Sequence, residues 1–575
     1  MLNLFGFNLD GMDVDRWLAA ARLVFTVAAL LGAALLTRGA DDRRAGRIVL
    51  GIAATGHLLA WFATMFPLPS VYGANGSMDR ENHLGWANVV ALGFSPLHTS
   101  QVHHLHFEPV WPLLVALASG FNVDRVNLVF QWAPLLAGLA LLLSLRSCWI
   151  RGMEPSEHRN VEAAFAALGA LLLIAVPGDF AGPFRNPWAL TFLLKPNHAL
   201  GLVLAPFAAL ALARAGTWRT RLVAGFVLQL VGWAFVIHMA LVVAGFAVFA
   251  ALSWLTRRSE RMKDAIDVGT AVGVNLLIVS PYLAMLALAY PLLLEGDASL
   301  RVSPFSERPF EGPLRLGALF LLSAFGAWSS YGKDGRFGRI LASQWLASHL
   351  VWQLFPVLGL LGQAREQDEA FYWCRFWTGL FAGVGMFRAM LLILGRIREN
   401  RSPLAAGRSA VAAAMALVLL LPSLLPAWWD PGTMDQYFVA ARQPLPDWIA
   451  EPTRFVRNNT PPDAVFAGDR NYARWIAAYG ARRVLISDAL NLPNDHLKRM
   501  EVENALLRDG PRSLLAEGRD RYSIQFVLAT SFPMDQAPEI TLDLLAARAY
   551  LVPVYDREFA HARVMIFKVR YEDLP

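Results

Sequence analysis

The sequence predicts a polytopic α-helical membrane protein of about 12 transmembrane helices, followed by a soluble α/β domain at its C-terminal end. Of its 575 residues, 56% are hydrophobic and only 17% are charged, whereas about a quarter of the residues of a soluble protein are charged. Apolar runs recur up to residue 429, and each is close to the roughly 20 residues that cross the hydrocarbon core as a helix. From Asp430 onward charges become frequent and no such run follows.

The predicted spans are the apolar segments between the loops. One further apolar segment, 109–120, is too short to span and is expected to lie in the interface or to re-enter the membrane. The first span is too long for the apolar part of a signal peptide and is expected to stay as a membrane helix. The predicted spans cover residues 17–37, 47–66, 127–146, 161–176, 198–214, 221–237, 239–255, 265–290, 314–331, 339–361, 371–394 and 409–425.

The charge distribution predicts which loops face the cytoplasm. Before Asp430 there are 33 Lys and Arg residues against 25 Asp and Glu residues. The excess lies in short loops, as the positive-inside rule requires, and nothing in it suggests a nucleic-acid partner. This assignment places both termini, the large first loop 67–127 and the domain 430–575 on the outer side of the membrane.

The outer domain has the pattern of a small α/β fold with its own core. An amphipathic helix at 446–456 is followed by a turn and by alternating strands and helices, with a helix at 472–479. The domain contains no glycine-rich phosphate motif and no zinc-ligand spacing, which favours a lid or docking role. Its predicted strands cover residues 464–467, 483–486, 522–529, 550–555 and 564–569.

The first outer loop concentrates ionisable residues. Asp79, Arg80 and Glu81 follow the second predicted span by about a dozen residues. A carboxylate just above the membrane can act as a general base, and apolar surroundings would raise its pKa. Arg80 can orient a carboxylate or contact phosphate. The alternative is that both acids are solvated loop residues.

A second cluster in the same loop joins His103, His104, His106 and Glu108. Histidine and carboxylate ligands suit a divalent ion such as Mn or Zn. Neighbouring side chains in an extended loop point in opposite directions, so three histidines within four residues seldom share one ion. Hydrogen bonding to an acceptor or a phosphate and a structural role are the other two interpretations.

This layout resembles that of the C-type (GT-C) membrane glycosyltransferases. Residues 79–84 (DRENHL) are similar to the acidic signature of the family's first outer loop, and residues 107–114 (FEPVWPLL) to its proline-rich entry into the next helix. In the outer domain, Trp448-Ile449 and residues 459–465 (NTPPDAV) are similar to a linker of bacterial members. The likeness covers nearly the whole chain through short motifs. One departure is that Arg80 separates the two acids, which leaves open whether Asp79 or Glu81 is the functional carboxylate.

The resemblance implies an enzyme of the bacterial inner (plasma) membrane. It would move a hexosyl or pentosyl group from a polyprenyl-phosphate carrier to a lipid, glycan or protein acceptor on the outer face. It implies no certain cofactor, although a divalent metal such as Mn or Mg can neutralise the leaving phosphate. A first-loop acid would be the base, and Asp179 is a candidate second acid, with a helix-cap or turn role as its alternative. The candidates for substrate or phosphate binding are Arg80, Arg185, Lys195, His198 and Arg375.

These phosphate candidates also have simpler interpretations. Arg185, Lys195 and Arg375 can snorkel to lipid head groups, and His198 can be a hydrogen-bonded interfacial histidine. For the whole chain, one alternative is a transporter or flippase of envelope lipids, which would place charges inside helices near the midplane. The others are a non-enzymatic scaffold for envelope assembly and a related outer-face enzyme such as a phosphoglycan ligase or lipid A modifier.

Overall fold

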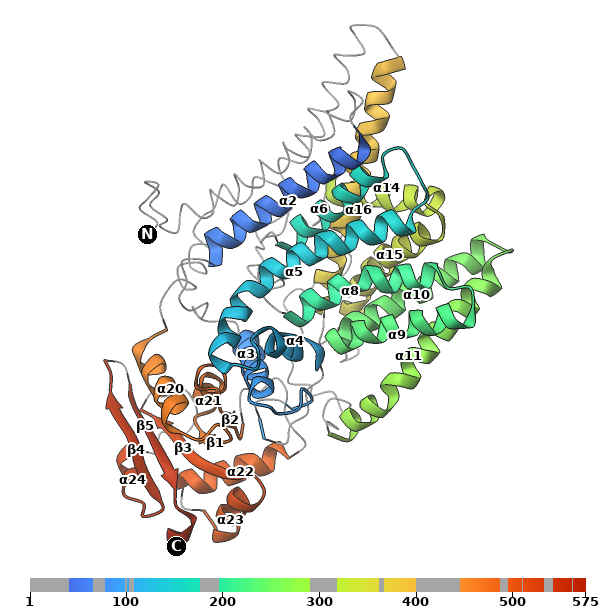
Figure 1. Ribbon diagram of the computed structural model, residues 1–575. Coiled ribbons are helices and arrows are strands. Elements are labelled where there is room, and N and C mark those ends of the chain that lie inside the picture. The colour runs from blue at the N-terminus through green and yellow to red at the C-terminus, as the bar shows by residue number, and fades with distance from the viewer. Residues whose placement is uncertain are drawn as a thin grey trace, which may run out of the picture. The chain divides into compact units, whose positions relative to one another are not determined.

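The computed structural model forms two compact units (Figure 1). Unit 1 takes its described residues from Met1–Pro67, Ala133–Pro281 and Gly296–Val439. Unit 2 takes them from Leu68–Trp132, Tyr282–Glu295 and Ala440–Pro575. The structure describes residues 41–65, 78–98, 101–102, 108–175, 196–289, 318–360, 367–399, 445–486, 495–508, 510–531, 541–560 and 562–574.

Unit 1 consists of long helices, which confirms the helical assignment of the predicted spans within the described residues. The predicted spans 17–37 and 409–425 lie outside those residues. Two of the helices, α5 and α11, are shared, because the first residues of α5 and the last residues of α11 belong to unit 2. The helices are α2 (Asp42–Met65), α5 (Val123–Gly152), α6 (Arg159–Ala175), α8 (Pro196–Ala213), α9 (Trp218–Ala234), α10 (Val236–Thr256), α11 (Arg261–Ala289), α14 (Ala318–Lys333), α15 (Gly335–Leu360) and α16 (Gln367–Glu399).

Among the described residues, two helical segments are long and apolar enough to cross a membrane by themselves. They are Leu135–Gly152 within α5, and α10. The short helix α4 (Val110–Ala118) and the start of α5 (Val123–Phe130) could form one further span, but they are bent by 110° relative to each other. This bend falls on the segment predicted to be interfacial or re-entrant. The total of about twelve spans stays a prediction.

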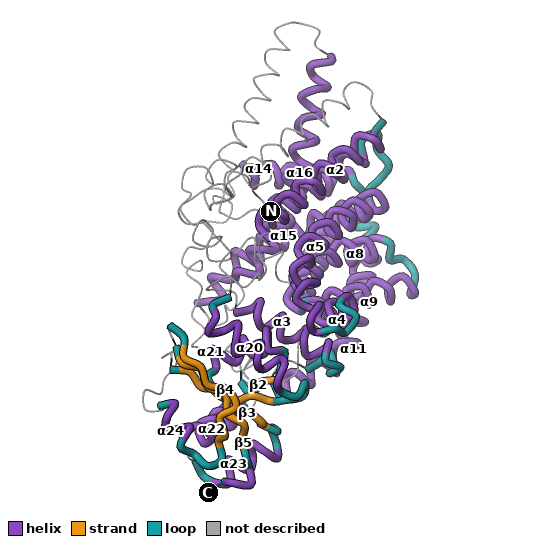
Figure 2. Tube along the Cα trace, turned by 60° about the vertical axis from the view of Figure 1, so that its left-hand side comes forward, coloured by secondary structure: helices purple, strands orange, loops and turns teal. Residues whose placement is uncertain are grey.

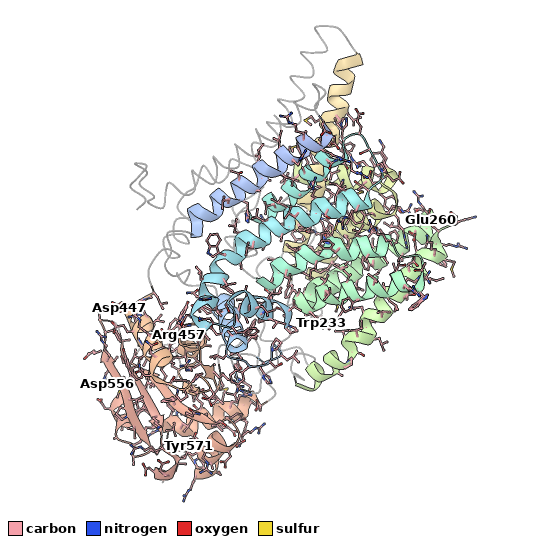
Figure 3. All side chains as sticks on the ribbon, in the orientation of Figure 1. Trp233, Glu260, Asp447, Arg457, Asp556 and Tyr571 are labelled. Atoms are coloured by element: carbon pink, nitrogen blue, oxygen red, sulfur yellow. The ribbon has the colours of Figure 1, made fainter. Side chains whose placement is uncertain are left out.

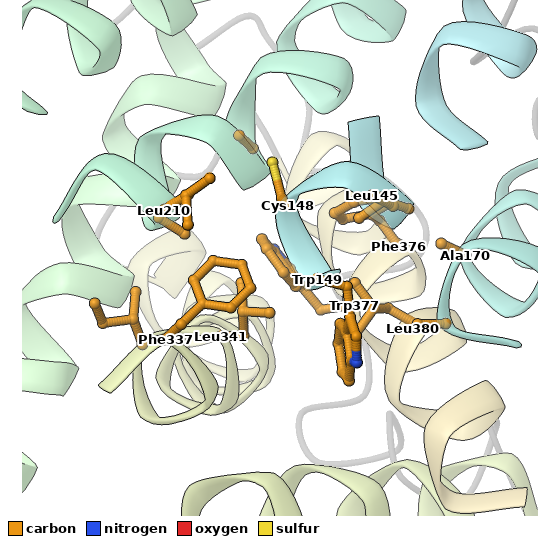
Figure 4. Close-up of a cluster of buried hydrophobic side chains, with 14 of the residues drawn as sticks. Leu145, Cys148, Trp149, Ala170, Leu210, Phe337, Leu341, Phe376, Trp377 and Leu380 are labelled. Atoms are coloured by element: carbon orange, nitrogen blue, oxygen red, sulfur yellow. The ribbon is translucent and has the colours of Figure 1, made fainter. Parts of the chain in front are cut away.

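The core of unit 1 joins aromatic side chains from helices far apart in the sequence (Figure 4). Trp149 of α5 and Trp377 of α16 are both fully buried, and Phe337 and Leu341 of α15 belong to the same cluster. An indole ring removes 150–250 Å² of surface from solvent. These side chains therefore tie α5, α15 and α16 together.

Glycines let α16 approach its neighbours at backbone distance. A Cβ added to Gly169 of α6 would lie 2.2 Å from the carbonyl oxygen of Gly379 on α16. A Cβ on Gly383 would lie 2.1 Å from the carbonyl oxygen of Phe165, and one on Gly385 would lie 2.0 Å from that of Leu322 on α14. Small residues at such crossings are typical of helix pairs in membranes, where close packing replaces the hydrophobic driving force.

Charged side chains join the helix ends along one face of unit 1. Arg336 Nη2 at the start of α15 lies 2.9 Å from Asp264 and 2.6 Å from Asp267, both near the start of α11. Arg388 of α16 pairs with Glu162 of α6 at 2.5 Å and with Asp334. Figure 3 shows Glu260, the partner of Arg339 at 2.5 Å, at the end of the α10–α11 pair. Residues at two basic connections, between α10 and α11 and between α14 and α15, therefore meet at these helix ends.

Unit 2 contains a five-stranded mixed sheet with the order β2-β1-β3-β5-β4 (Figure 2). β1 pairs in parallel with β2 and β3, whereas β5 pairs antiparallel with β3 and β4. The outer edge of β4 carries Pro553, a register shift and charged residues, features that prevent edge-to-edge pairing. The strands are β1 (Val465–Gly468), β2 (Arg483–Val484), β3 (Ile524–Thr530), β4 (Leu551–Glu558) and β5 (Arg563–Val569).

Helices cover both faces of this sheet. On one face, Phe466 and Phe526 pack against α20 (Asp447–Asn459) and α21 (Arg470–Trp475). On the other face, Val465 and Val527 pack against α22 (His496–Arg508) and α23 (Arg512–Asp520). Side chains along a strand alternate between the two faces, and this alternation explains why all four residues of β1 are buried. The α/β class of the domain and its strands agree with the prediction, but α22 and α23 were not predicted.

The predicted domain boundary at residues 429 and 430 stays a prediction, because residues 400–444 lie outside the described part. The compact unit that holds the sheet also includes the first-loop helices α3 (Met78–Ala91) and α4. The first loop and the C-terminal domain therefore share one folded unit.

Candidate functional site

The first-loop acids belong to the N-terminal turn of helix α3. Asp79 and Arg80 lie within this helix, and their side chains are outside the described part of the structure. Of the two acids, only Glu81 has a side chain that the structure describes. In an α-helix successive residues are 100° apart, so positions 79 and 81 are separated by roughly 200° around the axis. The two acids therefore occupy different faces of α3.

The carboxylate of Glu81 contacts three side chains of the C-terminal domain. Its Oε1 accepts hydrogen bonds from Trp475 Nε1 at 3.1 Å and from Tyr479 Oη at 3.4 Å. Its Oε2 lies 3.2 Å from Arg474 Nε, and both side chains of this ion pair are about 15% exposed. These partners come from α21 and from the π-helical turn η3 (Ile476–Gly480) that follows it.

The partners of Glu81 have a rigid aromatic support. Trp475 packs edge-on against Trp448 and Tyr472, with ring centroids 5.1 and 5.2 Å apart. Burial raises the pKa of the Tyr472 hydroxyl well above its usual value, so this group stays protonated and donates to the carbonyl oxygen of Trp448 at 2.5 Å. Trp448, which belongs to the motif Trp448-Ile449 of the family resemblance, thus packs directly against Trp475, one of the partners of Glu81.

The next face of α3 packs against the helices that follow in the first loop. The His83 ring meets Trp86 of its own helix and Trp111 of α4 edge-on, at centroid distances of 4.7 and 4.6 Å. Trp111 in turn meets Phe130 of α5 at 6.3 Å. Position 79 is four residues before His83 and seven before Trp86. Residues at these spacings lie on the same face of a helix, so position 79 lies on this face of α3.

The histidine cluster is only partly described. Glu108 is buried, at 6% exposure, directly before α4, whereas His103, His104 and His106 lie outside the described residues. Among the residues that the structure describes, no group of three or more His, Cys, Asp or Glu side chains could hold a metal ion. The interpretation of this cluster as a Zn or Mn site stays a prediction.

Unit 1 contains the two other described candidates, His198 and Arg375, at the helix ends opposite the charged face. The ring of His198, at the start of α8, packs against Phe235 with centroids 4.1 Å apart and planes tilted by 31°, and it meets His238 of α10 at 5.4 Å. His238 also meets Trp373 of α16 at 4.8 Å, and its Nδ1 would lie 2.3 Å from a Cβ on Gly201. Hydropathy alone did not reveal this cluster of His198, Phe235, His238 and Trp373, because its first and last members are 175 positions apart.

Burial limits what His198 and Arg375 can contact. His198 is 2% exposed and Arg375 is 1% exposed. Both side chains are therefore packed among the helices of unit 1. The remaining candidates, Asp179, Arg185 and Lys195, lie outside the described residues.

No family model matches the sequence, and no curated protein matches it significantly. Solved structures, however, share its fold. The archaeal oligosaccharyltransferase AglB from Archaeoglobus fulgidus, in complex with an inhibitory peptide and a dolichol-phosphate, is similar with a TM-score of 0.51 at 14% identity, over 92% of this chain and 75% of that one. ArnT from Cupriavidus metallidurans, bound to undecaprenyl phosphate, is similar with a TM-score of 0.51 at 13% identity, over 90% of this chain and 97% of that one. The chain thus has the fold of the GT-C membrane glycosyltransferases, as the sequence resemblance predicted.

Proposed function

We propose that this protein is a membrane glycosyltransferase that takes a sugar from a polyprenyl-phosphate carrier and transfers it to a lipid, glycan or protein acceptor on the outer face of the membrane. The observation that carries the proposal is the shared fold over nearly the full length of ArnT, whose structure holds undecaprenyl phosphate. The AglB structure holds the related lipid dolichol-phosphate together with a peptide. Both proteins of similar fold bind a polyprenyl-type phosphate, which supports a donor of the same chemical class for this protein.

In the proposed reaction a first-loop carboxylate accepts the proton of the acceptor hydroxyl while that oxygen attacks the anomeric carbon of the donor. The bond from the sugar to the phosphate breaks, and the polyprenyl phosphate leaves with the bonding electrons. A carboxylate serves this step because it can hold the proton as charge develops on the nucleophile. Asp79 is the proposed base, since Glu81 is occupied by its three partners.

The leaving phosphate needs positive charge or hydrogen-bond donors. Arg80, Arg185 and Lys195 are proposed to contact it directly. The burial of His198 and Arg375 favours a supporting role in the wall of the donor site. Asp179 is proposed as the second acid, and the three loop histidines with Glu108 as acceptor-binding groups.

The distribution of charge favours this proposal over a transporter. The ion pairs of unit 1 in the described residues lie mainly at helix ends, as with Arg336, Asp264 and Asp267. A transporter would carry such charges near the midplane, next to broken helices.

The proposal is tested by incubating the purified full-length protein with polyprenyl-phosphate sugars and a crude mixture of envelope lipids and glycans. We expect release of free polyprenyl phosphate and sugar incorporation into the acceptor fraction. A parallel sample with a chelator reports metal dependence. Absence of transfer from every polyprenyl-phosphate hexose and pentose would contradict the proposal and favour the scaffold alternative.

A further inference from the structure

The contact between α3 and the C-terminal domain is an ordered polar clamp. Glu81 forms its first part, with Arg474, Trp475 and Tyr479 as partners. The Arg474 guanidinium also stacks over the ring of Trp475 at 5.1 Å. Two hydrogen bonds and an ion pair therefore fix one carboxylate on a partly buried surface.

Asn88 forms the second part of the clamp. It lies seven residues after Glu81, which is two helical turns along the same face of α3. Its Nδ2 donates to the carbonyl oxygens of Ala477 at 3.2 Å and Ala478 at 2.8 Å. Carbonyls in the last turn of a helix lack partners within that helix, so Asn88 satisfies two groups that η3 leaves open.

A third contact ties the chain beyond α3 to the same domain. The backbone N–H of Val102 donates to the carbonyl oxygen of Val484 in β2 at 3.1 Å, and Gln101 forms a parallel bridge with Val484. The loop thus adds a short segment to the edge of the sheet next to β2. The domain therefore holds the first loop on both sides of the stretch 89–98.

We propose that Glu81 is a positioning residue: together with Asn88 it docks α3 on the C-terminal domain, so that position 79, on another face of the helix, presents the reactive carboxylate. This assignment rests on the proposed glycosyltransferase function. A proton accepted by Glu81 would remove the charge of its ion pair with Arg474 and weaken the hydrogen bonds from Trp475 and Tyr479, which makes Glu81 a poor base. A misplacement of about 1 Å at a reacting group can cost about 100-fold in rate, which gives the clamp a direct effect on turnover.

A double-mutant cycle with Glu81→Gln and Arg474→Gln in the full-length protein tests this role. Transfer of sugar from a polyprenyl-phosphate donor is measured across pH. We expect each single variant to lower kcat by about 10- to 100-fold, with KM for the donor within about threefold. The kcat of the double variant should be no lower than that of the less active single variant. The pH profile of every variant should keep the wild-type shape.

The opposite role predicts a different set of results. If Glu81 is the base, Glu81→Gln loses about 100- to 10,000-fold in kcat, while Arg474→Gln stays close to wild type and the two effects multiply. Loss of the acidic limb of the pH profile in Glu81→Gln alone would also overturn the proposal.

Hydrogen exchange of the α3 amides separates failure of the clamp from failure of the proposed function. We expect faster exchange over residues 84–91 in Glu81→Gln, Arg474→Gln and Asn88→Leu. Arg570→Gln is the matched control, because Arg570 forms an exposed ion pair with Asp573 at 3.9 Å in the same domain. If the wild-type protein transfers no sugar, the proposed function is contradicted, and the hydrogen-exchange rates still test whether the clamp exists. Unchanged exchange rates in all three clamp variants would overturn the clamp proposal.

Discussion

At the scale of single residues, helix α3 places on different faces two acids that are only two positions apart in the sequence. Glu81 meets the C-terminal domain through Trp475, which is 394 positions further along the chain. No local pattern could reveal that partner. The sequence motif therefore placed both acids in the first loop, but it did not predict that helix α3 carries them, and it could not divide their roles.

Replacing Asp79 by Asn should abolish most of the transfer activity without affecting folding. The amide cannot accept the proton of the acceptor hydroxyl, and loss of a general base costs about 100- to 10,000-fold in rate. Steady-state transfer assays measure the loss, and thermal unfolding of the purified protein serves as the control. Wild-type activity in Asp79→Asn would exclude this carboxylate as the base.

A second prediction at this scale concerns Asp495, which supports α22 in the C-terminal domain. Although burial raises its pKa, the hydrogen bond and charge of Arg499 outweigh this effect, and the pKa of the carboxyl lies below its usual value. Asp495 Oδ1 accepts from Arg499 Nε at 2.7 Å, and Oδ2 accepts from Tyr522 Oη at 2.9 Å. The stabilisation is therefore complete above a pH of about 4, the pKa of an unfolded Asp, and disappears as the pH falls through the lower folded pKa.

Asp495→Asn should accordingly destabilise the domain by about 1–3 kcal/mol at neutral pH. The difference from wild type should shrink below a pH of about 4. Hydrogen exchange of α22 in the full-length protein, followed against pH, measures both effects. A difference that stays constant down to a pH of about 2 would contradict the assignment.

At the scale of elements, hydropathy predicted the helices of unit 1 because apolar runs of membrane length have few other solutions. It could not predict which helices cross at glycines, since those contacts join residues distant in the sequence, such as Gly169 and Gly379, which are 210 positions apart. It also missed α22 and α23, whose exposed faces carry many charges and lack a long apolar run.

The crossing of α6 and α16 gives a prediction with a built-in control. In Gly169→Ala the new methyl group would meet a backbone carbonyl that cannot rotate away, and overpacking of this kind costs about 1–3 kcal/mol. Gly273→Ala in α11 has nothing within 4 Å of the added Cβ and should gain up to about 1 kcal/mol from helix propensity. Melting temperatures of the two purified variants measure the contrast. Equal melting temperatures would show that α6 and α16 do not meet at this glycine.

At the scale of the whole molecule, the family resemblance in the sequence predicted the fold that the chain shares with AglB and ArnT. The sequence motifs are short, and the identity to ArnT is only 13%. Fold is retained because helix packing constrains volume and small residues more than it constrains residue identity. The acceptor and the sugar depend on outer-loop side chains that the fold does not specify.

The most direct measurement is the turnover of a polyprenyl-phosphate sugar by the purified wild-type protein beside Asp79→Asn. We expect the wild type to release polyprenyl phosphate as it glycosylates an envelope acceptor, and the variant to be slower by about 100-fold or more. A wild-type protein that binds polyprenyl phosphate but releases none from any sugar donor, or a variant that turns over at the wild-type rate, would contradict the proposed mechanism.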